Sequence, residues 1–313
     1  MTKGRCVLSL ISLFALLSLF VVAPSAHAIY GGGDATGSPV VVFVRTAYSI
    51  GQTGDCSGTL IEAQIVVTAA HCLYDNTGNV SSTIGVCSPG VDVSVTDCMG
   101  VVTKVFIPPG FNLNESVATR TDDIAFLTIR SPLARTLPIV FADTPQMAKI
   151  LTDNTLLYVV GYGRSDPSSA YTASTPRSGS LNVNLDISNL IGRSFIANFW
   201  PVSSKYYDFC AGDSGAPVLL APEVGATQVT MVGIMTTGDV NNCGVMTSRG
   251  YFSGGMMQVG PYMNLWKSAQ TYLLNSVPVP KKSSIICQKG TLLKKVTAVK
   301  PVCPKGYVKK FNV

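Results

Sequence analysis

TAAHC at residues 68–72 and GDSG at residues 212–215 are the most informative segments of this 313-residue chain. His71 is the only histidine after residue 28, so it is the only imidazole there that can exchange protons near neutral pH. Ser214 lies in a segment that begins and ends with glycine, which allows a tight turn with an exposed hydroxyl. Together the two segments predict a serine nucleophile served by a histidine base.

Residues 1–28 have the pattern of a secretory signal peptide. Lys3 and Arg5 form the basic start, residues 7–22 form an apolar run, and AHA at residues 26–28 is a small-residue cleavage site. A membrane anchor is the alternative, but the run is short for a span and contains serine residues. No later segment of the sequence is long and apolar enough to cross a bilayer, so we expect an exported protein without a transmembrane anchor.

Eight cysteine residues follow the predicted signal peptide. An even number in an exported chain favours disulfide bonds over metal sites or free thiols. The sequence has no Cys-x-x-Cys pair and no second histidine after residue 28, so we expect no structural zinc site. The eight are Cys56, Cys72, Cys87, Cys98, Cys210, Cys243, Cys287 and Cys303.

Short β-branched runs recur between turn residues, which is typical of a protein made of β-strands. The alternation of apolar and polar residues from Leu181 to Ile187 has the period of a half-buried strand. A helix is indicated after Gly260-Pro261, because apolar residues from Tyr262 to Leu273 recur at spacings of three and four. We therefore predict an all-β fold closed by a C-terminal helix, as one large unit or two small barrels. The predicted strand segments are residues 40–45, 61–68, 91–95, 101–107, 124–129, 156–160 and 229–235.

The formal net charge of +6 hides an uneven distribution along the chain. Residues 281–313 contain nine lysines and no acidic residue, and residues 1–28 carry +2. Subtracting these +9 and +2 from +6 leaves residues 29–280 at −5. An acidic body thus carries a strongly basic tail, and SVPVP at residues 276–280 joins the two as a stiff, extended linker.

Acyl transfer by serine needs a base, a carboxylate that orients the base, and donors for the oxyanion. We assign His71 as the base, Asp123 as the orienting acid and Ser214 as the nucleophile. Asp123 precedes the apolar segment IAFL at residues 124–127, so its carboxylate is expected at the edge of a buried β core. The backbone N–H groups of Gly212 and Ser214 are the predicted oxyanion hole.

The order of these residues along the chain distinguishes classes of serine hydrolase. An α/β-hydrolase needs a histidine after the serine and a Gly-x-Ser-x-Gly elbow, but no histidine follows Ser214 and position 216 is Ala216. A subtilisin-like order needs an acid before His71. Asp34 and Asp55 are available, but the sequence shows no alternation of strands and helices. Both alternatives are disfavoured.

From residue 29 to about residue 276, the chain resembles the chymotrypsin/trypsin family of secreted serine proteases. The matching segments are IYGG at 29–32, TAAHC at 68–72, DIA at 123–125, GYG at 161–163 and GDSG at 212–215. Ala216 departs from the glycine usual in the family. The resemblance implies two six-stranded antiparallel barrels with the catalytic triad between them. We divide the chain into a signal peptide (1–28), a protease domain (29–275), a linker (276–284) and a basic module (285–313).

Disulfide pairs follow from the same resemblance. The family has one beside the catalytic histidine and one beside the serine, which leaves a local pair in the first barrel and a pair that would staple two short strands of the tail. The four expected pairs are Cys56–Cys72, Cys210–Cys243, Cys87–Cys98 and Cys287–Cys303.

Activation in this family places the ammonium group of a new N-terminal Ile or Val beside the aspartate that precedes the nucleophile. Here that pair is Ile29 and Asp213. A buried carboxylate without a cation is costly, which is the physical reason for such a pair. Since signal cleavage is predicted between Ala28 and Ile29, we expect signal peptidase itself to create the active terminus.

The primary specificity pocket is also assigned by resemblance. Asp208, six residues before Ser214, corresponds to the acidic floor that pairs with substrate Arg or Lys. Phe209 and Thr237 depart from the residues usual in the family, the first towards a shorter pocket and the second towards a wider one. We expect a preference for Arg or Lys before the scissile bond. The other expected lining residues are Thr236, Gly238 and Gly250.

The lysine-rich tail resembles small C-terminal modules of exported bacterial proteins that end in Cys-Pro-x-Gly-Tyr. Its summed charge predicts retention on an anionic cell-wall polymer or polysaccharide. A solubilising appendage, or a partner for the acidic body, is the alternative. Nucleic-acid binding is not expected, because the tail offers only Tyr307 and Phe311 for stacking and has no arginine.

These observations predict a secreted endopeptidase that acts on protein or peptide substrates through an acyl-enzyme, as a monomer and without a metal or organic cofactor. A catalytically silent binding protein on the same scaffold, held at the cell envelope by its tail, is the second hypothesis. It is disfavoured because inactive relatives commonly lose a triad residue. An esterase or another hydrolase with the same triad is the third hypothesis.

Overall fold

The chain divides into two compact units, Met1–Ala269 and Gln270–Val313. The computed structural model describes residues 29–49, 52–96, 98, 100–115, 120–134, 137–150, 155–165, 168, 172–191, 194–200, 207–220, 227–238, 243–245, 252–276, 283–298 and 300–309. The predicted signal peptide, residues 277–282 of the predicted linker and Gly250 lie outside the described residues.

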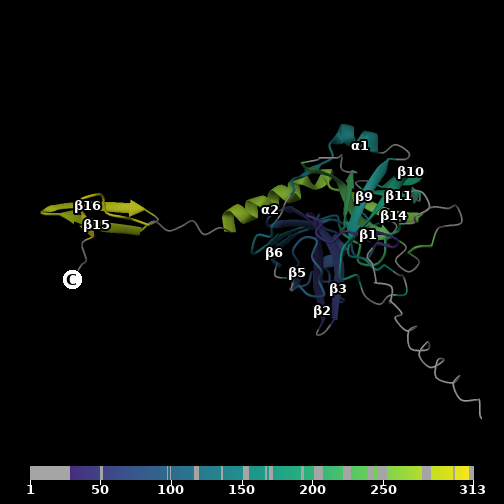
Figure 1. Ribbon diagram of the computed structural model, residues 1–313, viewed down its shortest axis with the longest axis horizontal. Coiled ribbons are helices and arrows are strands. Elements are labelled where there is room, and N and C mark those ends of the chain that lie inside the picture. Colours follow the sequence, from purple (N-terminus) through teal and green to yellow (C-terminus); the bar gives the residue numbers. More distant parts are fainter. Residues whose placement is uncertain are drawn as a thin grey trace, which may run out of the picture. The chain divides into compact units, whose positions relative to one another are not determined.

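The first half of the large unit is a closed barrel of six antiparallel strands in the order β2-β3-β4-β7-β6-β5, drawn in purple and blue in Figure 1. Strands β4 and β7 are buried along their whole length, as expected of continuous runs of apolar and β-branched residues. The barrel strands are β2 (Val41–Ser49), β3 (Gln52–Glu62), β4 (Ile65–Thr68), β5 (Ile84–Val86), β6 (Gly100–Phe106) and β7 (Ala125–Ile129).

The second half of the large unit is an eight-stranded sheet, drawn mostly in teal and green in Figure 1. Its path runs β1-β10-β11-β14-β13-β12-β9, and an additional β9–β10 pairing links the end of the path back to β10. Strand β8 pairs in parallel with β13. The strands are β1 (Gly33–Asp34), β8 (Ile139–Phe141), β9 (Leu156–Gly161), β10 (Arg177–Ile191), β11 (Ser194–Trp200), β12 (Pro217–Leu220), β13 (Val229–Gly238) and β14 (Phe252–Gln258).

Helices are few in the described part of the chain. The predicted C-terminal helix is confirmed as α2 (Met263–Ser276), preceded by the 3-10 turn η2 (Gly260–Tyr262), and a second 3-10 turn, η1 (Ala70–Leu73), carries His71. A further helix, α1 (Thr144–Ile150), was not predicted. A capping box begins it: the Gln146 N–H donates to Asp143 Oδ1 at 2.8 Å, and the Asp143 N–H donates to Gln146 Oε1 at 3.0 Å.

Two of the predicted strand segments need correction. Residues 91–95 form a turn instead of a strand, because Asp92 Oδ1 accepts hydrogen bonds from both the backbone N–H and the hydroxyl of Ser94. Residues 61–68 are interrupted by a two-residue turn at positions 63–64, where β3 ends and β4 begins.

Buried side chains from both halves of the large unit form one shared core cluster. Val41 and Phe43 of β2 pack with Val160 of β9 and with Tyr162. The rings of Phe43 and Tyr162 meet edge to face with centroids 5.4 Å apart, and the Tyr162 hydroxyl donates to the Val91 carbonyl at 3.0 Å. The prediction of a mostly β protein with a six-stranded barrel and a C-terminal helix is therefore confirmed.

The C-terminal module is a three-stranded antiparallel sheet in the order β16-β15-β17. Its strands are β15 (Ser283–Lys289), β16 (Leu292–Ala298) and β17 (Val308–Lys309). The buried Cys287 on β15 forms a disulfide bond with Cys303.

Disulfide bonds, which the cysteine count predicted, are present in both units. In the large unit they join Cys56 to Cys72, Cys87 to Cys98 and Cys210 to Cys243. Among the described helices, none combines the length and the apolar character needed to span a bilayer.

Candidate active site

His71 and Asp123 meet at the open end of the first barrel, where η1 follows β4 and Asp123 precedes β7. The Asp123 carboxylate is fully buried, and its two oxygens accept from the His71 backbone N–H at 2.9 Å and from Nδ1 of the ring at 2.7 Å. A carboxylate oxygen accepts this hydrogen bond, so a neutral His71 ring carries its proton on Nδ1, which leaves a lone pair on Nε2. The arrangement fixes both the orientation and the tautomer of a partly exposed imidazole.

The loop that carries Ser214 is shaped by two glycines with positive φ. Gly212 has φ 100° and Gly215 has φ 84°, values that favour glycine. A side chain at Gly215 would also collide with the Ser57 carbonyl and the Thr68 hydroxyl of the barrel. The loop therefore lies directly against β3 and β4.

Backbone hydrogen bonds fasten the same loop to both halves of the large unit. The Ser57 N–H donates to the Ser214 carbonyl at 2.9 Å, and the Gly215 N–H donates to the Met235 carbonyl at 2.6 Å. The Ser57 hydroxyl donates to the Gly212 carbonyl at 2.9 Å. These contacts fix the backbone around Ser214 relative to the barrel that carries His71.

The two informative sequence segments come together around one sulfur atom. Cys72 Sγ lies 3.7 Å from His71 Nε2 and 3.8 Å from the Ser214 carbonyl oxygen. Within the described part of the chain, the N–H groups of Gly212 and Ser214 have no hydrogen-bond acceptor, as donors for an oxyanion require. The site thus has a histidine with an available lone pair, a nearby serine loop and two backbone donors.

Asp213 is almost completely buried beside this loop. Its carboxylate accepts from the Gly163 N–H at 2.7 Å and from the Cys210 N–H at 3.0 Å. Burial raises the pKa of Asp213 to about 7 despite these hydrogen bonds, and the nearby Asp208 carboxylate adds to the increase. Ile29 is also buried, in the core cluster that contains Ala216, two residues after Ser214.

Asp208, which the resemblance assigns to the specificity pocket, is almost completely buried. Its carboxylate accepts from the Phe209 N–H at 2.8 Å and from the Gly244 N–H at 2.7 Å, and its backbone pairs with Tyr30. Phe209 is buried in the core, and a side chain placed on Gly238 would lie 3.3 Å from its Cβ. Asp208 is thus a buried carboxylate beside a large aromatic ring.

Strand β13 carries Thr236 and Gly238, the other described residues assigned to the pocket, and it pairs with β14. Thr236 donates its hydroxyl to the Gly255 carbonyl at 3.2 Å. Gly238 pairs with Gly254, and Thr237 pairs with Gly255. The pair GG at positions 254–255 is the signal that could have identified this segment, because a side chain on Gly255 would collide with the Thr237 hydroxyl.

Arg120 is a charged neighbour of the site that the sequence did not reveal. Its side chain is 11% exposed, and Nη1 lies 3.9 Å from Asp123 Oδ2. Nη2 donates to the carbonyls of Leu113 at 3.0 Å and Glu115 at 3.3 Å, while Nε is buried without a partner among the described residues. Its position three residues before Asp123 was the available sequence signal.

Asp122 is a second neighbour that positions Asp123. It is a non-glycine residue with φ 59°, and its Oδ1 accepts from the Tyr262 hydroxyl at 2.6 Å. Tyr262 lies in η2, near the end of the large unit. A residue near the C-terminal end of this unit therefore helps to hold the backbone next to Asp123.

Cys56, His71 and Cys72 form a cluster whose potential metal-ligand atoms lie within 4.8 Å of one another. The two sulfur atoms are bonded to each other, so they are not available as thiolate ligands. This cluster does not fit a zinc site while the disulfide is intact.

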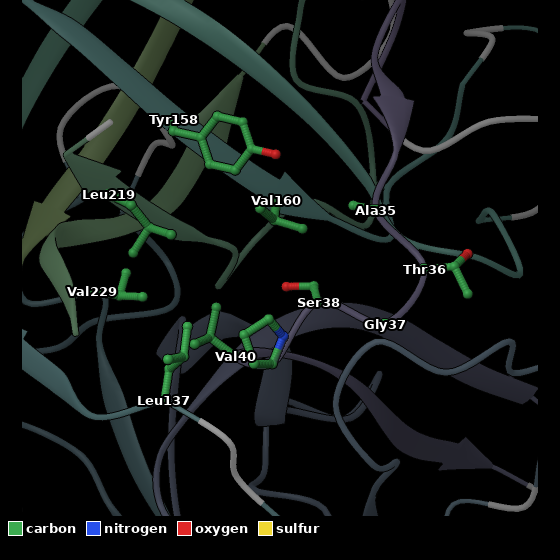
Figure 2. Close-up of a pocket in the computed structure, with 11 residues that line it drawn as sticks. Ala35, Thr36, Gly37, Ser38, Val40, Leu137, Tyr158, Val160, Leu219 and Val229 are labelled. Carbon is green, nitrogen blue, oxygen red and sulfur yellow. The ribbon is translucent and has the colours of Figure 1, made fainter. Parts of the chain in front are cut away.

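A cavity of about 320 Å³ lies elsewhere in the large unit and contains none of the predicted catalytic residues (Figure 2). Apolar side chains form most of its walls, with the Tyr158 ring on one side and Ser38 on another. Its lining residues are Ala35, Thr36, Gly37, Ser38, Pro39, Val40, Leu137, Tyr158, Val160, Leu219 and Val229.

Comparison with known proteins gives one family match. The family model described as Trypsin matches residues 30–254. A trypsin from Phaedon cochleariae is 28% identical over 179 residues, which cover 54% of this chain and 66% of that protein. A granzyme B from Rattus norvegicus is 26% identical over 205 residues, which cover 64% of this chain and 77% of that protein.

Proposed function

Because this chain belongs to the trypsin family, we propose that it is a serine endopeptidase that hydrolyses peptide bonds through an acyl-enzyme. The contact of 2.7 Å between His71 Nδ1 and Asp123 Oδ2 carries the proposal. It is supported by the hydrogen bonds that hold the Ser214 loop against the same barrel. The His71 lone pair, the Ser214 hydroxyl and the two free backbone donors supply the groups that acyl transfer needs.

In the proposed reaction, Ser214 Oγ attacks the substrate carbonyl carbon while His71 Nε2 takes the hydroxyl proton. The carbonyl oxygen becomes negative and accepts hydrogen bonds from the Gly212 and Ser214 N–H groups. His71 then donates its proton to the leaving amine as the C–N bond breaks, which leaves an acyl ester on Ser214. Water cleaves this ester by the same steps, and Asp123 stabilises each imidazolium that forms.

Labelling with a fluorophosphonate probe tests this proposal. We expect one equivalent to react, with the modification on Ser214, and we expect neither Ser214→Ala nor His71→Ala to react. Unlabelled wild-type protein with its disulfides intact would contradict the proposal. Cleavage of esters without cleavage of any protein would point to a different hydrolase.

Activation is proposed to follow cleavage between Ala28 and Ile29. The buried Asp213 carboxylate has two backbone donors and a pKa of about 7, so an added cation would stabilise its charged form. The Ile29 ammonium group is the proposed cation, since the Ile29 side chain shares a core cluster with Ala216. N-terminal sequencing of exported protein should begin Ile-Tyr-Gly-Gly, and an earlier start would require a second cut.

The proposed preference is for Arg or Lys before the scissile bond. Two backbone N–H groups hold the Asp208 carboxylate in place, and it adjoins Phe209, which lies beside Gly238. Chromogenic peptides that differ only at this position test the preference. Faster cleavage after Phe or Leu than after Arg would remove Asp208 from this role and assign the pocket shape to Phe209.

Export, domain organisation and retention complete the proposal. We propose a secreted monomer with a signal peptide (1–28), a protease domain (29–275), a linker (276–284) and a basic module (285–313). The β9–β10 pairing supports a second barrel within the protease domain. The nine lysines of residues 281–313 are proposed to retain the enzyme on an anionic surface of the cell envelope.

A further inference from the structure

The β15–β16 hairpin of the C-terminal module ends in a surface that combines leucine with lysine. Gly290, with φ 58°, and Thr291 form the turn between the two strands. Leu292 is 63% exposed and Leu293 is 57% exposed. We call this surface the hairpin tip, and its residues are Lys289, Leu292, Leu293, Lys294 and Lys295.

The strand register places apolar side chains on both faces of the sheet at this end. Paired residues of antiparallel strands share a face, and successive residues alternate between faces. Gln288 pairs with Leu293 on one side and with Val308 on the other, so these three lie in a row on one face. Leu292 pairs with Lys289 and lies on the opposite face, together with Cys287.

These exposed side chains do not contribute to a core within the module. Cys287 is fully buried and bonded to Cys303, so the disulfide links β15 to the segment that precedes β17. Val308 is 70% exposed, in addition to the two leucines. Exposed apolar side chains gathered at one end of a small sheet indicate a contact with another surface.

Charge and apolar exposure together indicate which surface this is. Three of the nine lysines belong to the hairpin tip, and residues 281–313 contain no acidic residue. A hydrated anionic polymer would need the lysines alone. A lipid bilayer offers both partners, since its phosphates attract lysine and its acyl boundary accepts leucine while the lysine stems extend to the head groups.

We propose that the hairpin tip binds an anionic lipid surface, with Leu292 and Leu293 entering the acyl boundary and the three lysines contacting lipid phosphates. The proposal rests on the retention of the protein at an anionic surface suggested above, and it does not depend on peptidase activity. It identifies that surface as a membrane instead of a cell-wall polymer.

Co-sedimentation of the full mature chain with vesicles tests the proposal. We expect binding to vesicles of phosphatidylglycerol and phosphatidylcholine, and little binding to vesicles of phosphatidylcholine alone. L292S/L293S should weaken vesicle binding about tenfold for each leucine, with unchanged retention on a dextran sulfate resin. K294Q/K295Q should weaken both kinds of binding, by about fivefold for each lysine at low salt.

Leu274→Ser is the matched control, because Leu274 is 78% exposed on α2 and lies outside the hairpin tip. It should bind vesicles and resin like the wild type. Intact mass under non-reducing conditions checks that each variant keeps its disulfides. Equal vesicle binding by L292S/L293S and the wild type would overturn the proposal, as would a wild type that binds the resin but not the anionic vesicles.

Hydrolysis of a soluble chromogenic peptide is measured on the same samples. A protein that binds vesicles but does not cleave the peptide would remove the proposed peptidase and leave the lipid surface in place. An active enzyme that ignores anionic vesicles would do the reverse.

Discussion

The two halves of the large unit differ in how complete their share of the site is. The first barrel holds His71 Nδ1 and Asp123 Oδ2 at 2.7 Å from each other. Asp123 Oδ1 also accepts from the His71 backbone N–H. The second half holds Ser214 next to Asp213. Burial removes the Asp213 carboxylate from solvent and raises its pKa to about 7.

Under the proposed activation, folding alone orients His71, whereas the Ser214 loop depends on an added charge. Hydrogen bonds within the barrel are sufficient to orient His71, since every partner belongs to the folded chain. A nearby cation would stabilise the ionised form of the buried Asp213 carboxylate. If the proposed activation holds, the first half supplies the oriented base and the second half controls when the enzyme becomes active.

The largest expected effect comes from breaking the completed half. Asp123→Asn keeps the shape but can no longer accept from both His71 donors, so the ring loses its correct tautomer. We expect kcat to fall on the order of 10⁴-fold with little change in KM. Steady-state kinetics with a chromogenic peptide measure this, and a loss below tenfold would remove Asp123 from the triad.

The next largest effect is expected from removal of the Ile29 ammonium group, the proposed partner of Asp213. A form beginning at Ala28 should be 10²- to 10³-fold less active than one beginning at Ile29, on the order of the loss from a damaged oxyanion hole. The two forms differ by one residue, so each serves as the control for the other. Equal activity would show that the Ile29 ammonium group has no role.

The same pair of proteins should differ in how stability depends on pH. Without the ammonium group, Asp213 is favoured as the neutral acid, because burial raises its pKa from 3.8 to about 7. Its contribution to stability is complete below pH 3.8 and is lost as the pH rises through 7, a change of ~4 kcal/mol. Thermal unfolding from pH 4 to 8 should show this decline in the form beginning at Ala28. Asp213→Asn in that form should remove it.

A smaller effect is expected from Arg120, which links Asp123 to the carbonyls of Leu113 and Glu115. Arg120→Met should lower kcat about tenfold with KM nearly unchanged, because the orienting acid loses a charged neighbour. Arg120→Lys should restore part of the loss, since it returns the charge without the planar fork. Arg45→Met, which breaks an exposed ion pair with Asp55, is the control. A change in stability without any change in kcat would make Arg120 merely structural.

The smallest effect is expected from removal of the Tyr262 hydroxyl. Tyr262→Phe removes the 2.6 Å hydrogen bond to Asp122 and should cost about 1 to 2 kcal/mol of unfolding free energy. Activity should fall by about twofold or less. Urea unfolding measures the cost, and Tyr158→Phe, in the cavity of Figure 2, should change stability by less than about 0.5 kcal/mol.

Sequence patterns were sufficient for features that depend on local composition. The buried runs of β4 and β7 and the period of α2 are properties of neighbouring residues, so both were predictable. Residues 91–95 have the composition of a strand, yet one side-chain hydrogen bond from Ser94 to Asp92 turns the chain. The β-branched composition of such a short run does not by itself decide between a strand and a turn.

The parts of the site that the sequence patterns did not reveal are particular side-chain contacts and strand pairings. Arg120 matters because its guanidinium group reaches carbonyls five and seven residues earlier in the chain as well as Asp123. Gly254 and Gly255 matter because they lie opposite β13. The sequence does not show which carbonyls the Arg120 guanidinium group reaches or that β13 pairs with β14. Both contacts became known only from the structure.

Ser57 has a consequence for how this molecule would fail. This one buried residue of the first barrel holds the backbone of Gly212 and Ser214, and its hydroxyl also accepts from the Tyr162 N–H at 2.9 Å. A slight separation of the two halves would break these bonds while leaving most strand pairings untouched. Activity would then be lost at a lower temperature than secondary structure. Enzyme turnover would therefore report a separation of the two halves before circular dichroism does.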